Sequence, residues 1–163
     1  MLPEPSTKLW IPLSPEDDWP PVGGENLWAE ALGNGRYRLD SVPFFAQGLA
    51  VGDVVTAEPD ANDELQIDEI VESSGNCTIR LIVYAEGPYG RDRKRVLNLF
   101  QGFGVEGEGM EAYNLVALNV PNSAPISAVK SLLREGCDKA WWDCEEGTIT
   151  DTWEQTEPPI REV

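Results

Sequence analysis

Carboxylate side chains are the groups with which this sequence is best equipped to bind or to catalyse. The 163 residues carry 29 Asp and Glu against 12 Lys and Arg and no His, which gives a formal net charge of −17. The missing His removes the commonest general base and metal ligand, and so excludes Ser-His-Asp and Cys-His hydrolases and His-ligated zinc sites built from this chain alone. Paired carboxylates can also catalyse, but no pair stands out by its position. We therefore predict no catalytic residue, no metal site and no cofactor.

The densest acidic segment lies between residues 53 and 72, where eight acids and no basic residue occur. A calcium-binding loop starting at Asp60 would need Gly at its sixth position and Glu at its twelfth, but these positions hold Leu65 and Val71. The polar run 60–64 is instead typical of the connection in a β-hairpin. We predict an exposed acidic hairpin that contacts a basic partner, against the alternative of a merely solvated strand face. The residues assigned to this contact are Asp60, Asp63, Glu64, Asp68, Glu69 and Glu72.

A second candidate contact is the segment WWDCEE at 141–146. Adjacent Trp141 and Trp142 would face opposite sides of a strand, so one is expected in the core and the other partly exposed. An exposed Trp beside carboxylates is typical of an interface hot spot. The predicted partner-binding residues here are Trp142, Asp143, Glu145 and Glu146.

Cysteines, glycines and one basic cluster offer three further motifs, and all favour a structural interpretation. Cys77, Cys137 and Cys144 form no CxxC pair and match no common metal-site spacing, so neither a metal site nor a disulfide framework is predicted. The glycines of 102–107 spell a formal GxGxxG, but a dinucleotide site needs this motif after a strand and at the start of a helix. Here it follows a predicted helix, which indicates a helix end and a turn. The basic cluster 91–95 is expected to pair with acidic segments of the chain.

The stretch 36–83 is the densest in strand and turn signals, and it is the scaffold that would hold the acidic hairpin. Apolar and polar residues alternate along several short runs, which is the pattern of half-buried strands. These strands are expected at 36–40, 54–57, 65–70 and 77–84. Four short strands with turns between them predict a small curled sheet or barrel.

The run YRLDSVPFFAQGLAVGDVV, followed by a strand pair and SGNCTIRLIV, resembles the bacterial family called domain of unknown function 4265. The resemblance covers most of residues 28–145 and rests on the order of several short motifs. It implies a common fold, and it favours a strand at 26–32, where the residues alone leave strand and helix open. No activity and no catalytic residue follow from it, because the family is defined without a function.

The periodicity changes after residue 90. Apolar residues of 91–103 recur at helical spacing, and Ser123 has the chemistry of an N-cap for a second helix that ends before Gly136. Strands are expected at 77–84, 105–108, 113–120 and 140–145. The resulting order of strand, helix, strand, strand, helix, strand is typical of a ferredoxin-like α+β fold.

Together these elements predict an α+β protein with a small β-barrel-like N-terminal half packed on a ferredoxin-like α/β C-terminal half. Residues 1–24, rich in Pro and acids, are expected to form an extended arm, and 148–163 an acidic tail. The single domain of 25–147 would consist of a curled β subdomain, 25–75, and a ferredoxin-like subdomain, 76–147.

Small size, single-domain architecture, the absence of His and strong acidity, together with the resemblance to a bacterial family, favour a non-enzymatic protein-binding module of the bacterial cytoplasm. Its most concrete form is an immunity or inhibitor protein that neutralises a basic toxin or enzyme. A charge of −17 argues against direct binding of nucleic acid or of an anionic membrane. The N-terminus lacks the pattern of a signal peptide, and no apolar run approaches the roughly 20 residues of a membrane span. The alternatives are a small-ligand-binding protein or hydrolytic enzyme with a carboxylate site in the cleft between the halves, and a regulator that mimics DNA.

Overall fold

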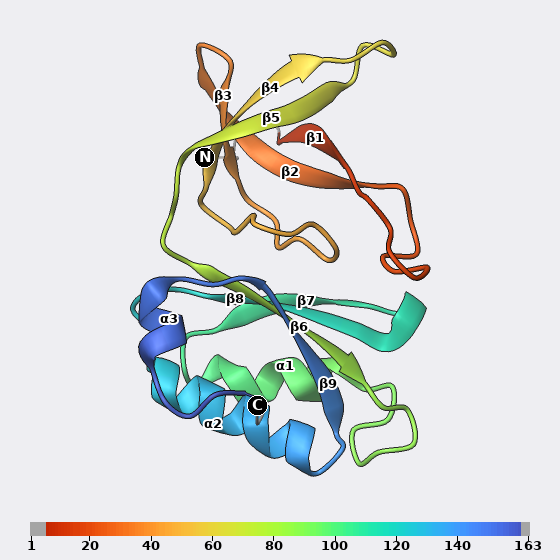
Figure 1. Ribbon diagram of the computed structural model, residues 1–163, viewed down its shortest axis with the longest axis vertical. Coiled ribbons are helices and arrows are strands. Elements are labelled where there is room, and N and C mark those ends of the chain that lie inside the picture. The colour runs from red at the N-terminus through yellow and green to blue at the C-terminus, as the bar shows by residue number, and fades with distance from the viewer. Residues whose placement is uncertain (1–5, 161–163) are drawn as a thin grey trace. The chain divides into compact units, whose positions relative to one another are not determined.

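The computed structural model describes residues 6–160, which form a mixed α/β protein, mostly of strands, with two sheets and three α-helices (Figure 1). The chain divides after Ser74 into two compact units. The predicted arm and tail also cover residues 1–5 and 161–163, and those parts of the two predictions lie outside the described residues. Among the described helices, none is long and apolar enough to cross a membrane.

The first unit is a ring of strands. Its elements are β1 (Thr7–Pro12), β2 (Gly24–Gly33), β3 (Arg36–Leu39), β4 (Val54–Pro59) and β5 (Leu65–Glu72). Each strand pairs antiparallel with the next, and β5 returns to pair with β1 at Trp10 and Gln66, which closes a barrel. Alternate side chains point inwards, and Leu9, Leu27 and Val55 are among those that fill the interior.

Strand β1 corrects the expectation of an extended arm over residues 1–24. It pairs along its whole length with β2 and buries Leu9 completely in the barrel. Residues 1–24 are rich in Pro, which is why the composition predicts an arm. The pairing of β1, however, depends on β2, a partner strand further along the chain. Local composition could not show that pairing.

The long connection between β3 and β4 folds back onto the barrel and buries Phe45, Ala46 and Leu49. Two buried carboxylates hold this loop in place. Glu25 on β2 accepts hydrogen bonds from the backbone N–H groups of Phe44, Phe45 and Ala46, at 2.6, 3.1 and 2.9 Å. Asp53 accepts the backbone N–H of Ala50 within the loop at 3.0 Å, and that of Ser74, beyond β5, at 2.8 Å. The loop is thus fastened by side chains because it has no strand partner of its own.

The second unit is an antiparallel sheet with helices α1 and α2 on one face (Figure 1). Its elements are β6 (Cys77–Val83), α1 (Arg93–Gln101), β7 (Glu106–Met110), a 3-10 turn (Ala112–Asn114), β8 (Leu115–Val120), α2 (Ile126–Asp138), β9 (Trp142–Thr148) and α3 (Asp151–Gln155). The strands lie in the order β7-β8-β6-β9. Leu81 and Leu118 on the sheet pack in one core with Phe100 of α1 and Leu133 of α2.

Helix α2 runs past Gly136 to Asp138, so the predicted helix end before Gly136 is wrong. A Cβ atom added at Gly136 would lie 2.1 Å from the indole ring of Trp142. Glycine therefore serves close packing here: it lets the helix backbone lie directly against that ring.

The described part of the expected acidic tail also belongs to the core, which corrects the second boundary. Thr150 caps α3 by accepting the N–H of Trp153 at 3.2 Å, and Trp153 is fully buried. The buried Lys130 of α2 donates to the carbonyls of Trp153 and Thr156, at 2.7 and 2.6 Å. A buried ammonium group at the carbonyl end of α3 satisfies groups that a helix leaves without partners.

Candidate functional site

The strongest candidate for a binding site is the acidic hairpin, defined as β4, β5 and their connection with the carboxylates Glu58, Asp60, Asp63, Glu64, Asp68, Glu69 and Glu72. The connection spans 60–64, as the polar run predicted. Oδ1 of Asp60 accepts the backbone N–H groups of Asn62 and Glu64, at 2.8 and 3.0 Å. Asp60 therefore shapes the turn, and the remaining carboxylates of the hairpin are exposed to solvent.

Strand β5 presents five consecutive exposed side chains, at 68–72, where a regular strand would alternate. The cause is two irregularities in its pairing with β4: Ala57 faces Ile67, but Val55 faces Ile70, and the register shifts again before Glu72. Each shift inserts an extra residue into β5, and such bulges re-aim side chains. The result places Ile70 and Val71, 43% and 39% exposed, between the carboxylates of Asp68, Glu69 and Glu72. The sequence interpretation missed this apolar pair, because the bulges arise from the pairing with β4 and have no local sequence signal.

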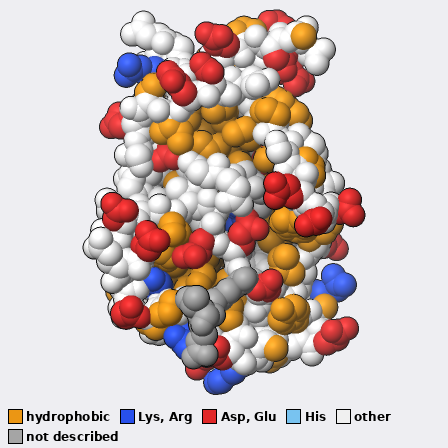
Figure 2. All heavy atoms as spheres, viewed as in Figure 1, with side chains coloured by type: hydrophobic (Ala, Val, Ile, Leu, Met, Phe, Trp, Pro, Cys, Tyr) orange, Lys and Arg blue, Asp and Glu red, His pale blue; other side chains and the backbone are white. Residues whose placement is uncertain are grey.

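The carboxylates of the acidic hairpin form no ion pair with any residue that the structure describes. Within residues 6–160, the carboxylates in ion pairs belong to Glu30, Glu135, Asp138 and Glu145, none of which lies in the hairpin. Figure 2 shows one face of the molecule, on which Asp and Glu side chains outnumber Lys and Arg. Uncompensated carboxylates within about one Debye length of each other, roughly 8 Å in physiological salt, add their potentials. The hairpin is therefore a source of strong negative potential.

The predicted contact on β9 is corrected at its central residue. Trp142 is 1% exposed, and its Nε1 donates to the carbonyl of Leu133 at 3.1 Å, so it cannot anchor a partner. Trp141 is the half-buried member of the pair and meets the ring of Tyr89 edge-on at 5.4 Å. Trp142 belongs to the core of the second unit, and Trp141 packs against that core.

Two of the three β9 carboxylates already serve the fold. The carboxylate of Glu145 accepts a hydrogen bond from Nε of the buried Arg80 at 2.8 Å and forms an ion pair with its guanidinium group. The carboxylate of Glu146 accepts a hydrogen bond from Nε1 of Trp153 at 2.5 Å. Asp143 is exposed. The predicted acidic residues thus fall into two groups in different units, and the hairpin group is the one with uncommitted charge.

Among the described residues, no ion pair joins the basic cluster 91–95 to an acidic segment, so the predicted pairing is not found there. Arg93 donates to Oδ1 of Asn114 at 2.7 Å, and the guanidinium of Arg95 lies over the ring of Tyr89 at 4.8 Å. Asp92 caps the start of α1 by accepting the N–H of Arg95. The glycines of 102–107 form the end of α1, a turn and the start of β7, as predicted.

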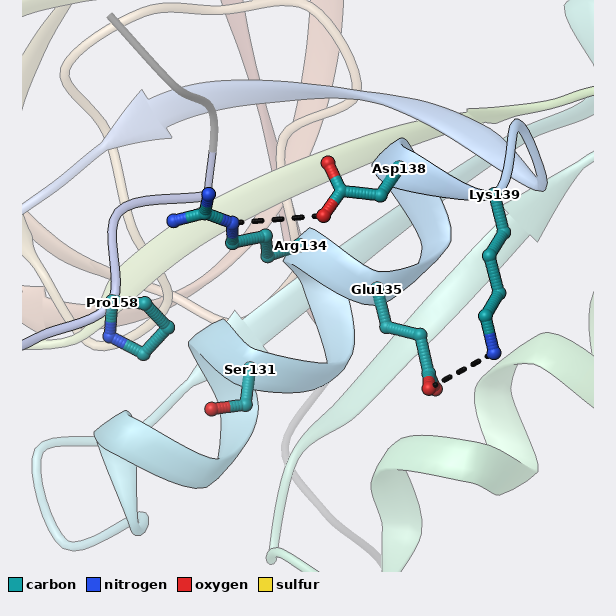
Figure 3. A pocket seen from close by; sticks show the side chains of 6 residues that line it. All are labelled: Ser131, Arg134, Glu135, Asp138, Lys139 and Pro158. Atoms are coloured by element: carbon teal, nitrogen blue, oxygen red, sulfur yellow. Dashed lines mark hydrogen bonds and ion pairs between the residues drawn. The ribbon is translucent and has the colours of Figure 1, made fainter.

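A shallow cavity of about 330 Å³ lies along α2, lined by Ser131, Arg134, Glu135, Asp138, Lys139 and Pro158. Figure 3 shows that its charged side chains pair along the helix: Arg134 with Asp138 at 3.6 Å and Glu135 with Lys139 at 3.3 Å. Such pairs one turn apart are an ordinary feature of a helix surface. Among the described residues, no three His, Cys, Asp or Glu side chains gather as a metal site would require.

A second cavity of about 250 Å³ includes Cys77 and Thr150 in its lining. Sγ of Cys77 lies 3.8 Å from Oγ1 of Thr150. Burial raises the pKa of the Cys77 thiol above its ordinary value of 9.0, and the hydrogen bond with Thr150 opposes this only in part. Because the thiolate is the nucleophile, Cys77 is held in its unreactive form at neutral pH.

We expect Cys77 to react with iodoacetamide at pH 7 at least roughly ten times more slowly in the native protein than in the denatured protein. The raised pKa means that the neutral thiol stabilises the fold fully below about pH 9, and that this contribution is lost as the pH rises through the raised value. Mass spectrometry of alkylated peptides measures the two reaction rates, and urea denaturation over a pH series measures the contribution to stability. Equal rates of alkylation in native and denatured protein would contradict the assignment.

Comparison with known proteins identifies a family and a solved structure that this chain resembles. No curated protein matches the chain. The structure is similar to the crystal structure of a hypothetical protein from Neisseria gonorrhoeae, with a TM-score of 0.74 and 21% sequence identity, over 91% of this chain and 98% of that chain. At this identity the likeness shows the fold alone. The model of the family described as Domain of unknown function (DUF4265) matches residues 25–144. Since that match covers most of the chain, the protein belongs to the DUF4265 family, as its sequence motifs predicted.

Proposed function

We propose that this protein is a non-enzymatic binding module that docks its acidic hairpin onto a basic protein in the bacterial cytoplasm. The most concrete form of the proposal is an immunity or inhibitor protein, which neutralises a toxin or enzyme by covering a basic functional surface. One observation carries it: the exposed carboxylates of the hairpin have no ion-pair partner among the described residues. A basic partner would supply the missing positive charge.

The hairpin has the arrangement that a docking surface needs. Ile70 and Val71 offer an apolar centre, and Asp68, Glu69 and Glu72 surround it with charge. Long-range attraction between opposite charges raises the rate of encounter, whereas desolvated apolar contacts at the centre of an interface lengthen the life of the complex. The surface lies on paired strands, so its backbone is held in place before the partner arrives.

We also assign the finer architecture. Ring closure between β5 and β1 supports a small β-barrel for the first unit. In the second unit, the chain order β6-α1-β7-β8-α2-β9 and the spatial order β7-β8-β6-β9 support a ferredoxin-like fold.

The function is tested with two variants of equal charge. In the hairpin variant, Glu64→Gln, Asp68→Asn, Glu69→Gln and Glu72→Gln remove four exposed carboxylates. In the control variant, Glu86→Gln, Glu106→Gln, Glu108→Gln and Glu111→Gln remove four exposed carboxylates of the second unit. The partner is first captured from a lysate of the source bacterium on wild-type protein at low salt, eluted with a salt gradient and identified by mass spectrometry.

Association rates of the captured protein with all three forms are then measured by surface plasmon resonance. We expect the hairpin variant to associate at least about ten-fold more slowly at low salt, and the control variant within about two-fold of the wild type. The wild-type rate should fall as the salt concentration rises. Equal slowing of both variants would show attraction by net charge alone, and an association rate indifferent to salt would count against the proposal altogether.

A further inference from the structure

Two cysteines that belong to no recognised sequence motif lie next to each other in the second unit. Sγ of Cys137, in α2, lies 2.9 Å from Sγ of Cys144, in β9, and both residues carry thiols. A disulfide bond is about 2.05 Å long. The two sulfur atoms therefore need to approach by less than about 1 Å to form one.

The packing of α2 on β9 explains why these thiols meet. Gly136 lets the helix backbone lie against the ring of Trp142, because no side chain stands between them. Leu133 receives Nε1–H of Trp142 on its carbonyl, and the thiol of Cys144 lies 3.9 Å from the same carbonyl oxygen. Cys137 follows Leu133 by one helical turn, and Cys144 follows Trp142 by two strand positions, so each lies on the face that carries its predecessor. The contact between the two elements thus continues from Leu133 and Trp142 to the two cysteines.

We propose that Cys137 and Cys144 form a redox-modification site, which closes to an intramolecular disulfide by exchange with a small disulfide such as glutathione disulfide. Cys137 is partly exposed and Cys144 is 4% exposed, so Cys137 is the thiol that the reagent reaches first. The third cysteine, Cys77, is 2% exposed and contacts Thr150, and it takes no part.

The exchange proceeds in two balanced steps. The Cys137 thiolate attacks one sulfur of glutathione disulfide, the S–S bond breaks, and one glutathione thiolate leaves and takes up the proton that Cys137 has lost. The Cys144 thiolate then attacks Sγ of Cys137 in the mixed disulfide and releases the second glutathione, which takes up the proton of Cys144. In sum, the protein loses two electrons and two protons, and glutathione disulfide is reduced to two glutathione thiols.

The experiment uses the full chain, equilibrated in buffers of stepped ratios of reduced to oxidised glutathione. After acid quenching, the remaining thiols are alkylated with N-ethylmaleimide in denaturant, and the intact mass and the peptide map are read by mass spectrometry. We expect two of the three thiols to disappear together, with a crosslinked peptide that joins Cys137 to Cys144 and an unmodified Cys77. This result needs no variant, so it does not depend on the folding of a mutant.

Two substitutions sharpen the test. In Cys144→Ser, glutathione should remain attached to Cys137 as a stable mixed disulfide, because the thiol that displaces it is absent. The matched control Cys77→Ser should still form the intramolecular disulfide. The proposal is overturned if the wild type keeps three thiols at every glutathione ratio, if its crosslink includes Cys77, or if it accumulates only glutathione on Cys137 without closure.

Discussion

Replacing Glu25 by Ala should lower the free energy of unfolding by roughly 3 kcal/mol or more, which is a large part of the stability of a small unit. Glu25 is 9% exposed, and its carboxylate accepts hydrogen bonds from three consecutive backbone N–H groups, those of Phe44, Phe45 and Ala46. Hydrogen bonds to a charged group contribute more than neutral ones, and each N–H group left without an acceptor in a buried place costs about 1–3 kcal/mol. Truncation to Ala removes all three acceptor contacts at once.

The matched control is Glu30→Ala, on the same strand. Glu30 is exposed, and its ion pair with Arg38 spans 3.5 Å at the surface. Exposed pairs of this kind contribute about 0–1 kcal/mol, so its loss should be nearly neutral. Urea denaturation followed by tryptophan fluorescence measures the free energy of unfolding of both variants. Trp19 is a suitable reporter, because the centroid of its ring lies 5.7 Å from that of Phe45. If Glu25→Ala were as stable as Glu30→Ala, the fastening of the loop by this carboxylate would be refuted.

Gly136→Ala should destabilise the second unit by about 3 kcal/mol, because an added methyl group overpacks a filled core. The new Cβ atom would lie 2.1 Å from the indole of Trp142. That ring has no room to retreat: its centroid lies 6.0 Å from those of Tyr89 and Phe100 and 5.6 Å from that of Trp141. The helix must therefore move away from β9, which breaks the bond from Nε1 of Trp142 to the carbonyl of Leu133.

Gly102→Ala is the control for this substitution. Gly102 ends α1 with a φ of −64°, which alanine adopts freely, and no atom lies within 4 Å of the added Cβ atom. Its effect should stay within about 0.5 kcal/mol, since surface substitutions away from special features rarely exceed that. Thermal unfolding by circular dichroism compares the two. A melting temperature for Gly136→Ala equal to that of Gly102→Ala would show that the ring and the helix are not in the close contact described.

Much of the fold is legible from local pattern. The alternation in 36–40 and 77–83, the helical spacing in 93–101 and the polar run 60–64 each predict the element that forms, because these signals arise from neighbouring residues. The strand at Thr7–Pro12 and the helix at Asp151–Gln155 are not predicted, because local pattern does not indicate them. Both are stabilised by partners far along the chain: β2 for the strand, and the buried ammonium group of Lys130 for the helix.

The candidate site divides along the same line. Composition alone establishes the charge of −17, the absence of His and the density of acids between residues 53 and 72, and these need no coordinates because they are sums over the chain. Which carboxylates remain available is a matter of three-dimensional contacts. Asp60 is used by its own turn, Glu145 by Arg80 and Glu146 by Trp153, so similar carboxylates in the sequence become different groups in the fold.

The same holds for the apolar and thiol groups of the two units. Bulges in β5 expose Ile70 and Val71, although a regular strand would have turned one of them inwards. Trp142 and not Trp141 enters the core, and Cys137 meets Cys144, because one glycine allows α2 to approach β9. Charge and local periodicity are properties of residues and their neighbours, and the sequence states them directly. Register, burial and the meeting of distant side chains follow from how strands and helices pack, and only the folded chain contains them.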